Sequence, residues 1–76
     1  MELSEKIVEL IAVGASITAN CQLCLQKHGD QALRSGATPA EVAAAIEVGN
    51  RVRKGSTAKM ASYSSAFQPD AARETK

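Results

Sequence analysis

Apolar residues recur every three or four positions along most of the chain, which is the spacing of helices that bury one face. The first such segment spans residues 4–18, where Ser4 is placed to cap a helix N-terminus and Glu5 lies in the first turn. Its apolar positions cover much of the circumference, so we expect this helix to be buried on more than one side. Glu9 is the exception, a carboxylate inside an otherwise apolar stretch.

A second helical segment is expected over residues 21–35, after a short break at residues 18–20. Asn20 is placed to cap its N-terminus, and Gly36 stands where helices often end in the left-handed conformation. Gly29 lies inside this helix, where a glycine lowers helix stability by about 1 kcal/mol relative to alanine. We interpret a glycine at such a position as a sign that another backbone approaches closely. One face carries Cys21, Cys24, Leu25, His28 and Ala32.

The third helical segment has the clearest start in the chain. Thr38 and Glu41 form a capping box, with Pro39 at the first helical position. We expect this helix to end near Lys54 and Gly55. Its apolar stripe consists of Val42, Ala45, Ile46, Gly49 and Val52.

A fourth helix is expected over about residues 57–67, capped by Ser56 or Thr57. The pattern therefore predicts an all-α fold, a compact bundle of about four helices that forms one domain over residues 1–68. Residues 69–76 are polar and are predicted to be a disordered tail. The residues expected to face inward from the fourth helix are Met60, Ala61 and Tyr63 or Phe67.

The size and composition of the chain favour an oligomer. A chain of 76 residues buries only a modest share of its surface, and small domains compensate with disulfides, metals or association. Two cysteines three positions apart close too small a loop to staple distant segments. With 14 alanines, one Phe, one Tyr and no Trp, each helix buries little area, so we expect a homo-oligomer.

The net charge of +1 gives no strong global field for nucleic acid, but the charge is unevenly distributed. Residues 1–50 carry a net −3 and residues 51–76 a net +4. We interpret Arg51, Arg53 and Lys54 as cations that complement the C-terminus of the third helix.

The sequence shows neither a signal peptide nor an apolar run long enough to span a membrane. A Cys-x-x-Cys pair without an export signal favours a cytoplasmic redox or metal role over a structural disulfide. We therefore expect a cytoplasmic protein that binds neither nucleic acid nor a membrane.

The chemistry of the chain is concentrated in Cys21-x-x-Cys24-x-x-x-His28. Cysteines at i and i+3 in the first turn of a helix can form a disulfide with little backbone change. Unpaired N–H groups at a helix N-terminus favour the thiolate, which is the nucleophile in disulfide exchange and peroxide reduction. His28 lies on the same face and is placed to exchange protons with the thiols.

Two other interpretations of these residues stay open. Cys21 and Cys24 can be small buried hydrophobic residues, and His28 a hydrogen-bonded core residue, in a non-catalytic binding or assembly module. Alternatively, the two cysteines and His28 can bind a metal with Glu9 as a fourth ligand. Three ligands on successive turns of one helix fit tetrahedral zinc poorly, so we predict no metal and no organic cofactor.

The stretch from Cys21 to Ile46, CQLCLQKHGDQALRSGATPAEVAAAI, resembles the alkylhydroperoxidase D-like branch of the carboxymuconolactone decarboxylase superfamily. That branch combines a glutamate, the C-x-x-C-x-x-x-H motif, a glycine that ends the helix, and a Thr/Ser-x-x-Glu start to the next helix. The resemblance covers about residues 5–60 and implies a small helical member with a single motif.

The resemblance implies a role for each motif residue. Cys24 corresponds to the cysteine that attacks the peroxide, and Cys21 to the one that resolves the sulfenic acid as a disulfide. His28 corresponds to the proton relay, and Glu9, twelve positions before Cys21, to the glutamate that completes it. Leu23 stands where peroxidase members often carry a second histidine, so one relay partner is lost.

The resemblance also implies an activity and partners. We expect an oxidoreductase that reduces an alkyl hydroperoxide or a disulfide and is itself regenerated by a thioredoxin-like or lipoyl-type dithiol. Members of the family assemble as trimers, hexamers or larger rings. The decarboxylase branch typically lacks the C-x-x-C motif, so decarboxylation is not expected.

Overall fold

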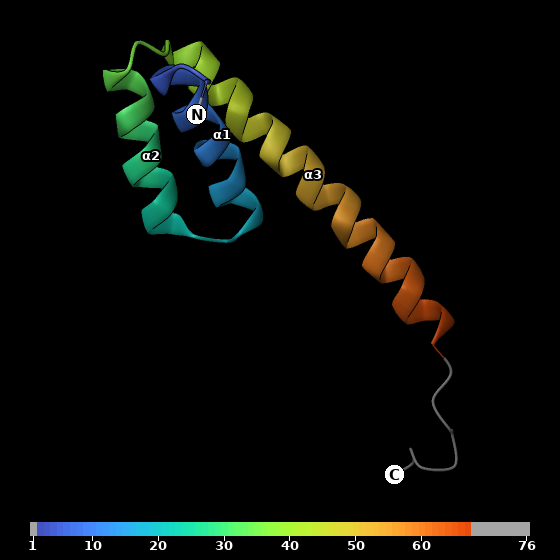
Figure 1. Ribbon diagram of the computed structural model, residues 1–76. Helices are drawn as coiled ribbons and strands as arrows, with labels where there is room; N and C mark the ends of the chain where they lie inside the picture. Colours follow the sequence, from blue (N-terminus) through green and yellow to red (C-terminus); the bar gives the residue numbers. More distant parts are fainter. Residues whose placement is uncertain (1, 68–76) are drawn as a thin grey trace.

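The computed structural model describes residues 2–67, which form three α-helices: α1 (Glu5–Thr18), α2 (Gln22–Arg34) and α3 (Pro39–Ala66) (Figure 1). The all-α prediction is confirmed within the described residues. The predicted fourth helix is wrong as a separate element, because α3 runs without a break through the expected end. The predicted polar tail at residues 69–76 lies outside the described residues.

Most of the sequence signals at the helix ends are confirmed. The Ser4 hydroxyl accepts a hydrogen bond from the Ile7 N–H at 3.2 Å and caps α1. At the start of α3 the Thr38 hydroxyl accepts from the Glu41 N–H at 3.1 Å, and Glu41 Oε1 accepts from the Thr38 N–H at 2.9 Å. Gly36, with a φ of 101°, turns the chain after α2.

The predicted cap of α2 is wrong. Asn20 has a φ of 56° and belongs to the turn between α1 and α2, whereas Cys21 is the N-cap residue. Asparagine tolerates this left-handed conformation better than most residues with a side chain. The turn therefore places a sulfur atom at the N-terminus of α2.

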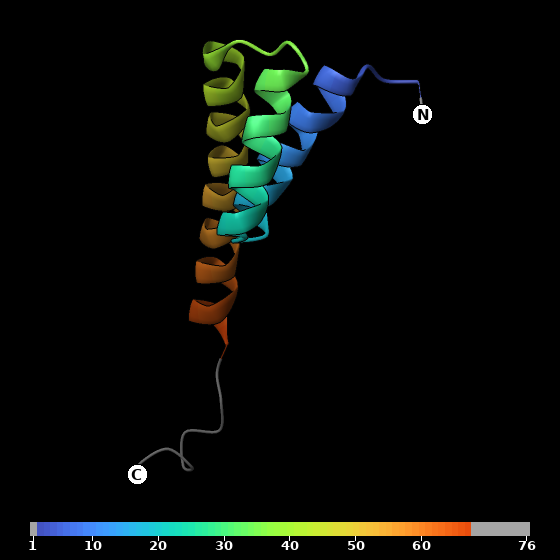
Figure 2. The same cartoon turned by 90° about the vertical axis from the view of Figure 1, so that its left-hand side faces the viewer.

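Helix α1 packs against both other helices, and α2 and α3 meet each other only slightly (Figures 1 and 2). Val13 of α1 is fully buried together with Ala32 of α2 and Ala37 of the loop before α3. A salt bridge of 3.3 Å between Lys6 Nζ and Glu41 Oε2 joins the first turns of α1 and α3. The core is small, as the alanine-rich composition led us to expect. The side chains packed around it are Leu10, Leu25, Val42, Ala45 and Ile46.

The closest approach between helices occurs at Gly49, not at Gly29. A Cβ atom at Gly49 would lie 2.8 Å from the Gly14 carbonyl oxygen and 2.8 Å from the Ile17 Cβ, so α1 and α3 meet backbone to backbone here. A Cβ at Gly29 would meet nothing within 4 Å. The expectation that Gly29 marks a close approach is therefore wrong.

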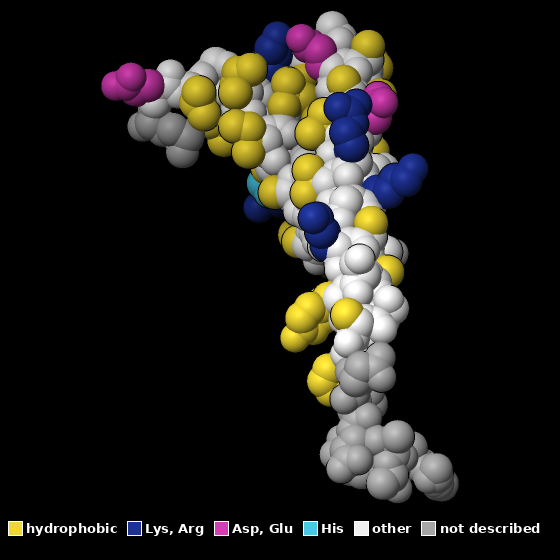
Figure 3. All heavy atoms as spheres, turned by 90° about the vertical axis from the view of Figure 1, so that its right-hand side faces the viewer, with side chains coloured by type: hydrophobic (Ala, Val, Ile, Leu, Met, Phe, Trp, Pro, Cys, Tyr) yellow, Lys and Arg dark blue, Asp and Glu magenta, His cyan; other side chains and the backbone are white. Residues whose placement is uncertain are grey.

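The second half of α3 extends beyond the other helices, and every residue from Asn50 to Phe67 is exposed (Figures 1 and 3). Met60, Tyr63 and Phe67, predicted to face inward, are 63%, 71% and 60% exposed. Gly55 continues the helix because a glycine inside a helix costs only about 1 kcal/mol relative to alanine. Within residues 2–67, no helix has both the length and the apolar character needed to cross a membrane.

Candidate dithiol redox site

The two cysteines form a disulfide at the N-terminus of α2. Cys21 is the N-cap residue and Cys24 lies in the first turn, with their Cα atoms 5.2 Å apart. The Cys24 backbone N–H donates a hydrogen bond to Cys21 Sγ at 3.1 Å. Because this N–H has no partner within the helix, it remains available to a sulfur that carries negative charge after reduction.

A partly buried pair of hydrogen-bonding side chains joins α1 to α2 near this disulfide. His28 Nδ1 lies 2.6 Å from Glu9 Oε1, and the two side chains are 30% and 15% exposed. A carboxylate can only accept a hydrogen bond, so Nδ1 is the donor and Nε2 is the nitrogen left for other partners. The contact explains why a carboxylate interrupts the apolar face of α1.

The two cysteines line different hollows on the surface. Cys24 and His28 line one hollow of about 220 Å³, whose remaining walls are small residues of α1 and the turn after it. Cys21 lines a second hollow of about 240 Å³. Ser16 is the one residue shared by both. The disulfide therefore has two faces, one beside the Glu9–His28 pair and one on the side of α3.

The structure brings all four sequence-predicted site residues to the interface of α1 and α2. Glu9 contacts His28, His28 shares a hollow with Cys24, and Cys24 is bonded to Cys21. Within residues 2–67, no three His, Cys, Asp or Glu side chains come together in a way that could hold a metal ion.

Leu23, between the cysteines, points away from the site and is 80% exposed. No second imidazole is available at this position. Among the described residues, His28 therefore contacts Glu9 without a second histidine nearby.

Sequence analysis missed Arg53, which lines the hollow at Cys21. The only signal was the basic cluster at residues 51–54, which was assigned to a helix C-terminus. That interpretation is wrong because α3 continues to Ala66, so the cluster lies in the middle of the helix. A cation there is placed by the packing of α3 on α1, which local sequence does not reveal.

The fold and the site together define a small helical protein with a dithiol–disulfide centre and an adjacent histidine–glutamate pair. The model of the carboxymuconolactone decarboxylase family matches residues 2–66, and the chain belongs to this family. The family includes alkylhydroperoxidase D-like members, so the resemblance stated from the motif is confirmed. No curated protein and no solved structure matches the chain.

Proposed function

We propose that the protein is a thiol-dependent oxidoreductase that reduces a peroxide, or else a disulfide, by cycling Cys21 and Cys24 between dithiol and disulfide. The observation that carries the proposal is the Glu9–His28 hydrogen bond beside a disulfide at a helix N-terminus. A carboxylate fixes the tautomer and the orientation of the histidine, so that Nε2 is left to exchange a proton with a thiol or a leaving oxygen.

In the proposed cycle Cys24 attacks first because it shares its hollow with His28. His28 Nε2 accepts the proton of the Cys24 thiol, the thiolate attacks the terminal peroxide oxygen, the O–O bond breaks, and His28 returns that proton to the departing alkoxide. This step converts the thiol and the hydroperoxide into a sulfenic acid and an alcohol. The hollow has small walls and holds about 220 Å³, enough for a small hydroperoxide.

Cys21 then resolves the sulfenic acid. Its thiolate attacks Cys24 Sγ, water departs, and the disulfide seen in the structure forms. An external dithiol, thioredoxin-like or lipoyl-type, returns both sulfurs to thiols by two successive exchanges and is itself oxidised to a disulfide. We place this cycle in the cytoplasm, where such dithiols keep thiols reduced.

Stopped-flow reaction of the reduced protein with a panel of peroxides, followed by mass spectrometry, tests the proposal. We expect rapid peroxide loss and a product lighter by two hydrogens, with the new bond between Cys21 and Cys24. Cys24→Ser should abolish turnover, and Cys21→Ser should leave Cys24 as a sulfenic acid. Gln26→Ser, an exposed change on α2 outside the hollows of both cysteines, is the matched control. Full turnover by Cys24→Ser would overturn the assignment of roles.

Failure with peroxide has a defined meaning. If both thiols stay intact with every peroxide yet exchange rapidly with disulfides, the protein is a disulfide reductase. Thiols that are alkylated slowly and react with neither would assign the chain to a non-catalytic binding or assembly module.

The relay is tested separately with Glu9→Gln, which keeps the size of the side chain and removes its charge. General acid–base catalysis contributes about 10²–10⁴-fold to rates, so we expect a loss of at least about 10²-fold. The pH–rate profile should change in shape as well as height, because the imidazole loses the carboxylate that holds its orientation. An unchanged profile would exclude a relay role for Glu9.

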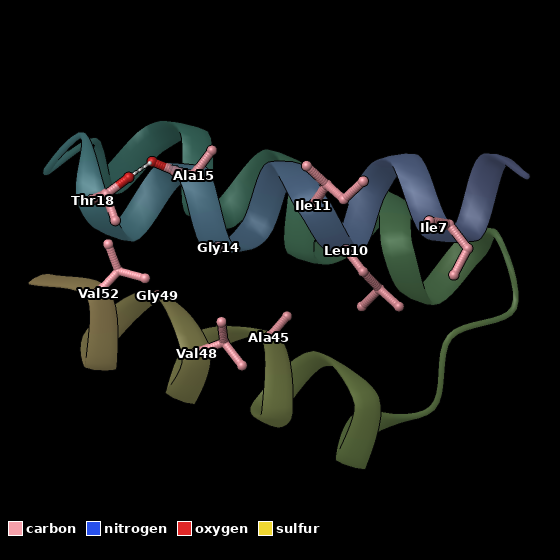
Figure 4. Close-up of a pocket in the computed structure, with 10 residues that line it drawn as sticks. All are labelled: Ile7, Leu10, Ile11, Gly14, Ala15, Thr18, Ala45, Val48, Gly49 and Val52. Atoms are coloured by element: carbon pink, nitrogen blue, oxygen red, sulfur yellow. Dashed lines mark hydrogen bonds between the residues drawn. The ribbon is translucent and has the colours of Figure 1, made fainter. Parts of the chain in front are cut away.

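We also propose that the protein works as a homo-oligomer in which the exposed half of α3 packs against a second copy. An apolar groove of about 550 Å³ runs between α1 and the middle of α3, lined by Ile7, Ile11, Val48 and Val52 among others (Figure 4). Hydrophobic side chains also stand out along the exposed half of α3 (Figure 3). Exposed apolar patches of this extent are typical of interaction sites.

The distribution of charge favours one arrangement of the copies in the proposed oligomer. Residues 51–67 contain four basic side chains and no acidic one, so two such segments would repel each other if packed side by side. The acidic part of the chain, residues 1–50, includes α1 and most of the groove. We therefore place the exposed half of α3 from one copy in the groove of the next. Such a head-to-tail contact closes into a ring when the rotation allows, as in a trimer or hexamer.

Light scattering of the purified protein tests the assembly. We expect a mass that is a fixed multiple, three or more, of the chain mass at micromolar concentration. A stable, folded monomer would overturn the proposal, and a dimer would contradict the head-to-tail arrangement.

A further inference from the structure

The hollow at Cys21 has a chemical character different from that of the hollow at Cys24. Its walls are Ser16, Ile17, Asn20, Cys21, Gln22, Leu25 and Arg53. The charged group among them is Arg53, which comes from α3, whereas Cys21 belongs to α2. An arginine and three neutral polar residues therefore line this hollow together with Cys21.

Arg53 forms no ion pair with any carboxylate among the described residues. The salt bridges there join Lys6 to Glu41 and Arg51 to Glu47, and the Glu9 carboxylate is held by His28. Arg53 also lines a neighbouring hollow of about 300 Å³ together with Thr18, Asn20, Val52, Ser56 and Thr57. Arg53 is thus an exposed cation that lines both hollows, and a guanidinium offers several hydrogen-bond donors to a ligand.

From this arrangement we infer that Cys21 is the sulfur attacked by the external reductant, and that Arg53 recognises negative charge on that reductant. The inference deepens the proposed function and rests on it. The nucleophile in disulfide exchange is a thiolate, so a cation beside the attacked sulfur favours its approach. A second anionic group on the reductant, such as a carboxylate or sulfonate, can bind the planar guanidinium through two hydrogen bonds.

In the inferred exchange reaction, the reductant attacks on one face of the disulfide and the leaving thiolate departs on the other. The incoming thiolate forms a bond to Cys21 Sγ from the α3 side, the Cys21–Cys24 bond breaks, and Cys24 departs as a thiolate toward the hollow of His28. His28 Nε2 passes to it the proton that the reductant thiol gave up. A second reductant thiolate attacks the mixed disulfide on the reductant sulfur, and Cys21 leaves as a thiolate that accepts the Cys24 N–H and faces Arg53. The disulfide gains two electrons, and the reductant becomes a disulfide.

Three small thiols of similar size but different charge test the inference without the physiological reductant. They are 2-mercaptoethanesulfonate, 2-mercaptoethanol and 2-aminoethanethiol, whose attacking thiolates carry net charges of about −2, −1 and 0. The second-order rate constant for opening the disulfide is measured with each thiol for the natural protein and for Arg53→Ala. Because the comparison is between variants, the intrinsic reactivity of each thiol cancels.

We expect Arg53→Ala to lower the rate constant for 2-mercaptoethanesulfonate about fivefold. A fivefold change corresponds to ~1 kcal/mol, which is the attraction between two unit charges about 4 Å apart in water. The loss should be smaller for 2-mercaptoethanol and absent for 2-aminoethanethiol, and added salt should diminish it. Arg53→Lys should restore part of the preference. Lys54→Ala, which removes an equal charge from the adjacent exposed position, should match the natural protein.

The outcomes separate this inference from the proposed function. If Arg53→Ala lowers the rate constant equally for all three thiols, or if Lys54→Ala has the same effect, Arg53 does not recognise charge on the reductant. The inference then fails, whereas the proposed redox cycle is unaffected. A graded loss specific to Arg53 supports it. If no thiol opens the disulfide of the natural protein, the proposed function fails, and the inference fails with it.

Discussion

The two halves of α3 have the same pattern of apolar residues but different surroundings. In the first half, Val42, Ala45 and Gly49 lie against α1. The stripe reaches Val52 and, after a gap of eight positions, resumes at Met60, Tyr63 and Phe67 with spacings of three and four residues, and all four side chains stay exposed among residues 2–67. Periodicity therefore identifies the apolar face of a helix, whereas the partner of that face depends on where the other helices end.

The packed and exposed parts of the molecule differ most in what they contribute to the dithiol site. Its residues all lie in the packed part of the molecule, except that Arg53 comes from the first turn of the exposed part. Chemistry that needs fixed distances, such as the 2.6 Å contact of His28 with Glu9, is built where two helices hold each other. The exposed half carries apolar surface and positive charge, which the proposed assembly would use.

The largest expected effect comes from changing the exposed half alone. The double variant Tyr63→Lys with Phe67→Lys places two charges on the apolar stripe, so we expect the oligomer to dissociate with little change in the helices of the packed part. Light scattering gives the mass, and circular dichroism the helix content.

The matched control is Ser62→Lys with Ser65→Lys, which adds the same charge to the opposite face of α3. The control should keep the mass of the natural protein. Equal dissociation of both variants would point to general charge repulsion. If neither variant dissociates, the apolar stripe of α3 is not part of the interface.

The packed half is tested at its closest contact. Gly49→Ala places a methyl group 2.8 Å from the Gly14 carbonyl oxygen, a backbone atom that cannot move alone. Overpacking of this kind costs about 1–3 kcal/mol, which outweighs the gain in helix propensity. We expect a lower thermal unfolding midpoint, measured by circular dichroism.

Gly29→Ala is the opposite case, because its Cβ meets nothing within 4 Å. The change should raise stability by up to about 1 kcal/mol through helix propensity alone. If Gly49→Ala were also stabilising, α1 and α3 would have to lie farther apart than the structure has them.

These two glycines show how far the sequence could take the prediction of the fold. Capping residues and apolar spacing are local signals, so the starts of α1 and α3 and the turn at Gly36 were predicted correctly. Which glycine lies at a helix crossing depends on how helices distant in sequence meet, and the choice of Gly29 was wrong. The continuity of α3 through Gly55 was missed for a similar reason, because a glycine can either end a helix or be tolerated inside it.

The site shows the same limit. Cys21, Cys24 and His28 share one helical face within eight residues, so their proximity follows from the period of the helix. Glu9 stood out as a carboxylate in an apolar stretch and as a possible metal ligand, but its relay role beside His28 came only from the family resemblance, since that contact joins two helices. Arg53 lies 32 positions after Cys21, and no pattern near either residue predicts that both line one hollow.

A smaller effect is expected from Gly55→Ala in the exposed half. Nothing lies within 4 Å of the added methyl group, so the change acts only through helix propensity, by about 1 kcal/mol. Amide hydrogen exchange should slow in residues 51–60 and stay unchanged in α1. Slower exchange in α1 as well would show that the two halves of α3 unfold as one unit with the rest of the molecule.

The smallest effect concerns the first turn of the packed half and appears only in acid. The pKa of Glu41 lies below its ordinary value of 4.5, first because its carboxylate accepts the Thr38 backbone N–H and then because Lys6 donates to it. The folded state therefore favours the ionised form. The resulting stabilisation is complete above the pKa of the unfolded chain and is lost as the pH falls through the lower pKa of the folded state.

Glu41→Gln isolates this contribution. Glutamine can still accept the Thr38 N–H and complete the capping box, but it does not titrate in this range. Thermal unfolding midpoints measured from pH 7 to about pH 3 should therefore fall less steeply for Glu41→Gln than for the natural protein. Lys6→Ala removes one cause of the shift and should give an intermediate slope. Parallel curves for all three proteins would mean that Glu41 caps α3 without any preference for its charged form, and that the acid sensitivity of the fold arises elsewhere.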